Sequence, residues 1–165
     1  MENAMHLVLS GLIVGIGATV LLDLWAIFQR QVFSATPLSW CLVGRWVGYL
    51  PRGQFSHQSM AKVPSIKGEC LIGWVTHYVT GIVFAVTLFL LMGTEWVRQP
   101  TLYPALAFGL ATVIFPFFIM QPGLGAGIAA SKTPNPNRAR LRSLLNHGIF
   151  GVSLYICALI LATLR

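Results

Sequence analysis

Residues 7–28 read LVLSGLIVGIGATVLLDLWAIF, a run in which Asp23 is the single charged side chain. An α-helix needs about 20 consecutive, mainly apolar residues to cross the hydrocarbon core of a bilayer. The run therefore predicts a membrane-spanning helix. It is longer than the apolar part of a secretory signal peptide and no basic stretch precedes it, so we expect it to be retained as a helix of the mature protein.

Three further apolar windows of similar length follow this run. The chain of 165 residues is 56% hydrophobic and 9% charged, with a mean hydropathy of +0.74, whereas about 25% of the residues in soluble domains are charged. This composition excludes an ordinary soluble enzyme, a disordered chain and a disulfide-rich secreted protein. We expect an all-α membrane protein that forms a single integral membrane domain over residues 1–165. Its four transmembrane helices are predicted at about residues 7–28, 70–92, 102–121 and 143–164.

The basic residues predict the orientation of these helices. Of 11 Lys and Arg residues, only Arg98 and Arg165 lie outside the first and third connections between the windows. Because Lys and Arg near helix ends mark the cytoplasmic side, both termini are expected outside and these two connections inside. The nine basic residues are Arg30, Arg45, Arg52, Lys62, Lys67, Lys132, Arg138, Arg140 and Arg142.

The net charge of +7 is then a topology signal. No basic soluble module is present that would bind a nucleic acid, so no nucleic-acid partner is expected. The expected partner is the lipid bilayer, and the basic connections are expected to contact anionic lipid headgroups.

The first connection contains an apolar, aromatic segment at residues 38–50 that is too short to span a bilayer. Trp40, Trp46 and Tyr49 lie in it, and Pro51 follows it. Because Trp and Tyr favour the membrane interface, we expect an interfacial or re-entrant helical segment here, with Arg45 as a candidate contact of a lipid headgroup.

The third connection begins with the glycine-rich run Pro122-Gly123-Leu-Gly125-Ala-Gly127. A dinucleotide site would need a preceding buried strand, and this run follows a predicted membrane helix instead. Two readings remain, a turn where backbones approach closely and a nest of N–H groups that binds an anion or a lipid phosphate. In the second reading the contacts are Gly123, Gly125, Gly127, Lys132, Arg138 and Arg140.

Cys41, Cys70 and Cys157 are odd in number and widely spaced, without a Cys-x-x-Cys pair. They indicate neither a disulfide framework nor a zinc or haem attachment motif. We expect them to be small apolar packing residues.

Ionisable side chains inside the predicted membrane helices are the candidate functional residues, because each costs about 2.5–3.5 kcal/mol to insert. Asp23, His77 and His147 lie at similar predicted depths in the cytoplasmic half of three helices, and Gln121 is a neutral companion. Small residues flank each histidine at four-residue spacing, as is typical of close helix contacts. In the third window Pro116 is expected to interrupt the helix.

Several roles are open for Asp23, His77 and His147. They are compatible with a proton or cation relay, with a divalent metal site or acid–base catalysis, and with a structural network of hydrogen bonds. Two histidines also match axial haem ligation, although the chain has no other haem or nucleotide motif. The sequence leaves the cofactor undetermined, with a divalent metal as the candidate.

The chain also resembles a known family of small membrane proteins. The resemblance rests on Asp23-Leu-Trp25, Gly44-Arg45-Trp46, Trp74-x-x-His77-Tyr78, the run from Pro116 to Gly127, the Thr133-Pro-Asn-Pro136 turn and His147. The family consists of small four-helix proteins of the bacterial inner membrane, catalogued as a domain of unknown function. The resemblance implies a bacterial inner (cytoplasmic) membrane location and a multi-pass architecture, and it transfers no catalytic residue or substrate.

Three functions follow as hypotheses, and the sequence does not decide whether the protein is an enzyme. The first is a small carrier or channel-like protein with a proton or cation site. Because four helices enclose only a thin pathway, this hypothesis expects a homo-oligomer. The second is a membrane-embedded enzyme that acts on a lipid or isoprenoid headgroup, and the third is a structural or accessory subunit.

Overall fold

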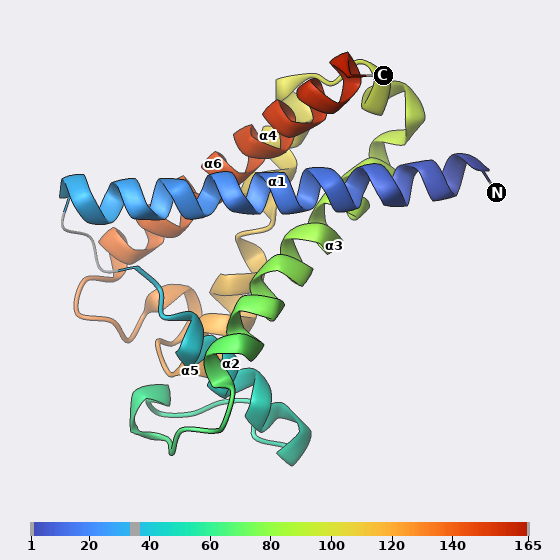
Figure 1. Cartoon of the computed structure of the whole chain (residues 1–165). Coiled ribbons are helices and arrows are strands. Elements are labelled where there is room, and N and C mark those ends of the chain that lie inside the picture. The colour runs from blue at the N-terminus through green and yellow to red at the C-terminus, as the bar shows by residue number, and fades with distance from the viewer. Residues whose placement is uncertain (1, 34–36, 165) are drawn as a thin grey trace. The chain divides into compact units, whose positions relative to one another are not determined.

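The computed structural model describes residues 2–33 and 37–164, and all regular elements in this part of the chain are helical. No strand occurs there, so the all-α prediction is confirmed. A π-helical segment and three 3-10 turns also occur, at Pro116–Met120, Leu50–Arg52, Met60–Lys62 and Ile128–Ala130. The α-helices are α1 (Glu2–Phe33), α2 (Trp40–Tyr49), α3 (Glu69–Arg98), α4 (Leu102–Ala111), α5 (Gln121–Leu124) and α6 (Pro136–Thr163) (Figure 1).

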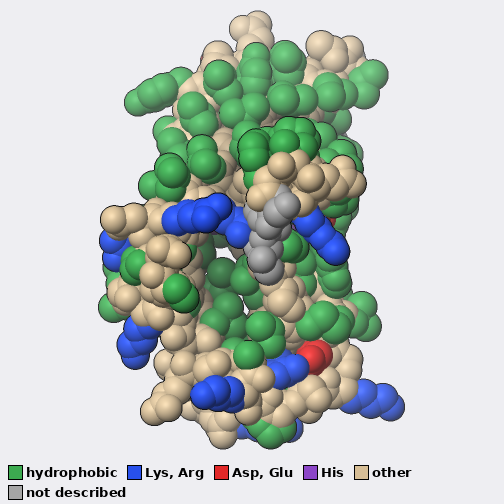
Figure 2. Space-filling model, turned by 90° about the vertical axis from the view of Figure 1, so that its left-hand side faces the viewer, with side chains coloured by type: hydrophobic (Ala, Val, Ile, Leu, Met, Phe, Trp, Pro, Cys, Tyr) green, Lys and Arg blue, Asp and Glu red, His purple; other side chains and the backbone are tan. Residues whose placement is uncertain are grey.

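In the described part of the chain, four helical stretches are long and apolar enough to cross a membrane, and each overlaps one predicted window. Large hydrophobic side chains are exposed along them, including Leu71 and Leu90 on α3, and Figure 2 shows such side chains over one face of the molecule. Exposed apolar side chains suit contact with lipid, so the chain has the helices of a multi-pass membrane protein. The four stretches are Met5–Phe33, Glu69–Arg98, Leu102–Leu124 and Pro136–Thr163.

Two of the membrane helices are interrupted. In α3 the backbone at Gly93 has φ 77° and ψ 178°, so regular helix ends at Met92, which is also the predicted end of the second window. A φ near +77° favours glycine because it lacks a Cβ atom. In the third stretch, Pro116 begins the π-helical segment, which confirms the predicted interruption.

The chain forms two compact units, and each is described by itself. The first unit comprises Met1–Pro37, Tyr78–Thr112 and Asn146–Arg165, and the second comprises Leu38–His77 and Val113–Leu145. This division leaves the expectation of a single membrane domain as a prediction. The core of the first unit is formed by Val14, Ala18, Ala85, Leu88, Phe89, Trp96, Val97, Ala105, Phe150, Leu154 and Ala158.

Glycines allow the helices of the first unit to approach at backbone distance. A Cβ atom on Gly15 would lie 2.6 Å from the Ile82 Cα, which is too close for any real side chain. On the next pair of helices, a Cβ atom on Gly109 would lie 2.5 Å from the Gly151 Cα. The small-residue stripes of α1 and α6 therefore mark close helix contacts, as their four-residue spacing predicts.

In the second unit, α2 packs against the beginning of α3. A Cβ atom on Gly44 would collide with the Glu69 carbonyl oxygen, and one on Gly73 with the Trp40 carbonyl oxygen. The predicted helical segment of the first connection is therefore confirmed as a helix, while its depth at the membrane interface stays a prediction.

The prediction that all three cysteines are packing residues is wrong for Cys41 and Cys70, which form a disulfide between α2 and α3. Their Cα atoms lie only 3.9 Å apart although the residues are 29 positions apart in sequence. The close crossing at Gly44 and Gly73 brings them together, and no local cysteine motif signals such a crossing. Cys157 has a free thiol and is half-buried.

We predict that Gly15→Ala lowers the stability of the purified protein in detergent by about 1–3 kcal/mol, because the added methyl group displaces the Ile82 backbone. Thermal unfolding followed by circular dichroism measures the change. Gly148→Ala is the matched control, because its Cβ atom would meet only a Leu110 methyl group at 3.6 Å. We expect Gly148→Ala to leave the stability unchanged or to raise it by up to about 1 kcal/mol, since alanine favours a helix more than glycine does. Equal melting temperatures for wild type and Gly15→Ala would contradict the close contact.

Candidate functional site

The predicted site residues are divided between the two units. Asp23 on α1 and His147 on α6 belong to the first unit, whereas His77 on α3 and Gln121 on α5 belong to the second. Their convergence on one shared site stays a prediction.

Asp23 is half-buried on α1 and accepts a hydrogen bond from the Tyr78 hydroxyl at 3.0 Å. Tyr78 lies on α3, so this bond connects two membrane-spanning stretches. Sequence reasoning singled out His77 and passed over its neighbour Tyr78. The missed signal is that a tyrosine in the interior of a membrane helix needs a hydrogen-bond partner for its hydroxyl group.

His147 contacts Thr112 at the end of α4. Its Nδ1 lies 2.8 Å from the Thr112 Oγ1, and the same hydroxyl group donates to the Gly109 carbonyl oxygen. A hydroxyl group has one hydrogen, so both contacts are satisfied when Nδ1 carries a hydrogen and donates it to Oγ1. In the neutral ring, Nε2 is then the nitrogen that can accept a proton.

Asn146, the residue before His147, connects α6 to α1. Its Oδ1 atom accepts hydrogen bonds from Trp25 Nε1 and Gln29 Nε2, both at 3.2 Å. Gln29 is 7% exposed, so its amide depends on this partner. We call the hydrogen-bonded side chains of the first unit the polar belt. All four helices of that unit contribute to it: Asp23, Trp25, Gln29, Tyr78, Thr112, Asn146 and His147.

In the second unit, His77 is buried among aromatic rings. Its imidazole stacks on Trp40 with 3.9 Å between ring centroids, and Trp74 lies edge-on at 5.9 Å. The exposed fraction of His77 is 8%, which confirms that this histidine faces protein. Gln121 donates from Nε2 to the Ser143 hydroxyl at 3.2 Å, and its buried Oε1 has no partner among the described residues.

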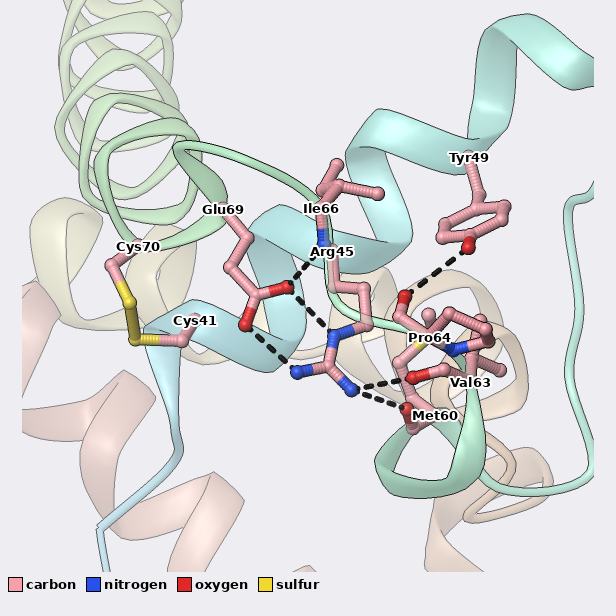
Figure 3. Close-up of polar contacts among 9 residues, drawn as sticks. All are labelled: Cys41, Arg45, Tyr49, Met60, Val63, Pro64, Ile66, Glu69 and Cys70. Atoms are coloured by element: carbon pink, nitrogen blue, oxygen red, sulfur yellow. Dashed lines mark hydrogen bonds and ion pairs between the residues drawn. A yellow bond between two sulfur atoms is a disulfide. The ribbon is translucent and has the colours of Figure 1, made fainter.

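Arg45 is held by protein groups in the second unit. Its Nε and Nη2 atoms donate to the two carboxylate oxygens of Glu69, both at 2.8 Å, and Nη1 donates to the carbonyl oxygens of Val63 and Met60 (Figure 3). Glu69 also accepts the Ile66 backbone N–H, which fixes the end of the loop before α3. The two side chains are only 13% and 14% exposed.

The hydrogen bonds that Arg45 donates to Glu69 raise the pKa of its guanidinium group above the ordinary value, so the cation persists at every physiological pH. Arg45 therefore clamps residues 60–69 to α2. Its predicted contact with a lipid headgroup stays a prediction.

The glycine-rich turn of the third connection packs against the first connection. Gly123 has no room for a side chain beside the Trp46 ring, and its carbonyl oxygen accepts the His57 N–H at 3.1 Å. Gly125 and Gly127 have φ values of 90° and 76°, where glycine is favoured. These contacts match a turn at which backbones approach closely, which is one of the two readings.

The basic residues after this turn differ in their contacts. Arg140 donates to the Ala129 carbonyl oxygen and to Asn137, while Lys132 and Arg138 are exposed. Binding of an anionic headgroup by Gly123, Gly125, Gly127, Lys132, Arg138 and Arg140 stays a prediction.

A metal site needs several ligands in one place. Among the residues that the structure describes, no group of three or more His, Cys, Asp or Glu side chains is placed to hold a metal ion. The metal hypothesis for Asp23, His77 and His147 stays a hypothesis.

We predict that Asn146→Ala destabilises the protein by about 1–3 kcal/mol, because the half-buried Trp25 donor and the buried Gln29 donor both lose their acceptor. Asn137→Ala is the control, since Asn137 is exposed and accepts only a surface bond from Arg140. We expect its effect to stay within about 0.5 kcal/mol. The melting temperatures of the two variants in detergent are compared with that of the wild type. If Asn146→Ala lowers the melting temperature no more than Asn137→Ala does, the Asn146 contacts have no structural role.

The comparisons with known proteins show a family and add no activity. The chain matches no curated protein and no solved structure. Residues 12–161 match a family model with the description "Protein of unknown function (DUF2938)". This match covers nearly the whole chain, including every residue of the polar belt, and the chain therefore belongs to the DUF2938 family.

Proposed function

We propose that this protein is a small carrier or channel-like membrane protein in which Asp23 binds a proton or a small cation. The hydrogen bond between Asp23 and Tyr78 carries the proposal, because it places a carboxyl group with a suitable partner inside a membrane-spanning stretch. A carboxylate at that depth is costly, and function is the usual reason for its presence.

The position of Asp23 distinguishes it from the other acidic residues. The chain has four Asp and Glu residues in total. Glu69 begins α3 and is paired with Arg45, while Glu95 is exposed beyond the break at Gly93. Glu2 lies at the start of α1 and outside the apolar stretch. Asp23 is thus the acidic residue with apolar sequence on both sides.

Tyr78 suits a carboxyl group that changes protonation state. Its hydroxyl donates a hydrogen bond to the ionised carboxylate and, after rotation, accepts one from the protonated acid. Neither state then leaves a buried polar group without a partner. His147 lies in the same unit as Asp23 and contacts the Thr112 hydroxyl group.

The proposal includes the orientation and the assembly that the sequence predicts. Both termini lie outside a bacterial inner membrane, and the two basic connections lie in the cytoplasm near anionic lipids. A homo-oligomer forms the pathway, because one copy offers only four spanning stretches.

Proton flux into proteoliposomes tests the role of Asp23. A potassium gradient with valinomycin drives protons inward, and a trapped pH-sensitive dye reports the rate. Asp23→Asn keeps the shape of the side chain and removes its titration, so we expect flux to fall by about tenfold or more, close to the leak of protein-free vesicles. Tyr78→Phe should give an intermediate rate, because it removes the hydrogen-bond partner and keeps the carboxylate.

Glu95→Gln is the matched control, because it removes an equivalent charge from an exposed position on α3. We expect its flux to equal that of the wild type. Wild-type flux no faster than the vesicle leak, or identical flux in wild type and Asp23→Asn, would refute the proposal and favour a structural or headgroup-directed role. Repeating the measurement with sodium or potassium gradients separates a proton from a metal cation.

A further inference from the structure

The disulfide between Cys41 and Cys70 is partly exposed at the surface of the second unit. Cys70, in the first turn of α3, is exposed, and Cys41, in the first turn of α2, is half-buried (Figure 3). A disulfide of this kind is open to attack by a thiolate, since access to the sulfur controls the exchange rate. Packing alone does not explain a bond at this position.

The same two helices are joined by a second, non-covalent link. Arg45 follows Cys41 by one helical turn, and its partner Glu69 directly precedes Cys70. Gly44 and Gly73 keep the two backbones in contact at the same crossing. Cleavage of the disulfide therefore leaves α2 on α3, and the two thiols stay close together. Each of the two thiols therefore meets the other at an effective concentration of about millimolar or more, which favours rapid re-formation of the disulfide.

The predicted location adds a second argument. The basic residues place this connection on the cytoplasmic side of the membrane. Thiols there are kept reduced, and the disulfides that do form in the cytosol are usually transient and serve catalysis or redox sensing.

We propose that Cys41 and Cys70 form a reversible thiol–disulfide exchange site. A dithiol or a low-molecular-weight thiol reduces it, and a disulfide compound oxidises it. The proposal concerns the second unit and does not depend on ion flux through the first.

The reduction proceeds in two balanced steps. A thiolate of the reductant attacks one sulfur, the S–S bond breaks, and the other cysteine leaves as a thiolate while a mixed disulfide forms. A second thiolate of the reductant attacks the mixed disulfide and releases the remaining cysteine. Two electrons pass to the protein, its thiolates take up two protons, and the reductant becomes a disulfide. Oxidation is the reverse of these steps.

Mass tagging of thiols in cells tests the first part of the proposal. In a Cys157→Ala background, cells are quenched with acid and free thiols are labelled with a maleimide polymer. We expect two tags per chain in untreated cells, no tag after treatment with the thiol oxidant diamide, and two tags again after dithiothreitol. A pair that is already oxidised in untreated cells, or that keeps both tags after diamide, overturns the proposal.

The role of the ion pair is tested on purified protein that has been reduced and transferred to oxidised glutathione. Arg45→Lys loses the two-pronged contact with Glu69, so we expect intramolecular disulfide formation to slow by about tenfold. Arg138→Lys is the matched control, because it makes the same exchange at an exposed site, and its rate should equal the wild type. A wild-type rate in Arg45→Lys would show that the ion pair does not position the thiols. If Arg45→Lys does not fold, Glu69→Gln provides the same test, because it weakens the ion pair by removing the charge of the carboxylate partner.

Discussion

The hydrocarbon interior of a membrane offers no hydrogen-bond partner to a peptide group, and the rest of this structure depends on that constraint. Each of the four spanning stretches satisfies its backbone internally as a helix. Side chains that carry polar atoms must then find partners on neighbouring helices. The Asn146 amide, the Tyr78 hydroxyl and the His147 ring all do so within one unit. Glycine supports the same arrangement, because helices that touch at the backbone bring short polar side chains within reach of each other.

Much of the fold could be predicted because its determinants are local in sequence. Apolar runs long enough to span a bilayer locate the four stretches, and Pro116 marks the interruption of the third. The four-residue spacing of Gly11 and Gly15 identifies the face of α1 that contacts α3, where Val86 and Ile82 lie against these glycines. The glycine spacing is informative because a helix repeats every 3.6 residues, whereas the apolar runs and Pro116 are informative through bilayer thickness and the missing proline N–H.

The contacts that sequence reasoning missed join residues that are far apart along the chain. Arg45 and Glu69 are 24 positions apart, and Cys41 and Cys70 are 29 positions apart. Charge counting assigned Arg45 to the lipid surface, because it treats every arginine near a helix end alike. Only the crossing of α2 over α3 shows that a carboxylate and two backbone carbonyl groups lie around this side chain. Tyr78 was passed over for a similar reason, since its partner Asp23 lies on another helix.

The length of α1 has a consequence for the membrane itself. Its spanning stretch, Met5–Phe33, has 29 residues, which corresponds to a rise of about 44 Å. A typical hydrocarbon core is about 30 Å thick, so this helix is too long to stand upright with both ends at the interface. It must tilt, extend into the headgroup layer or thicken the bilayer around it. Each adjustment costs free energy that depends on bilayer thickness, and the local lipid composition thereby becomes part of what determines the angle of α1.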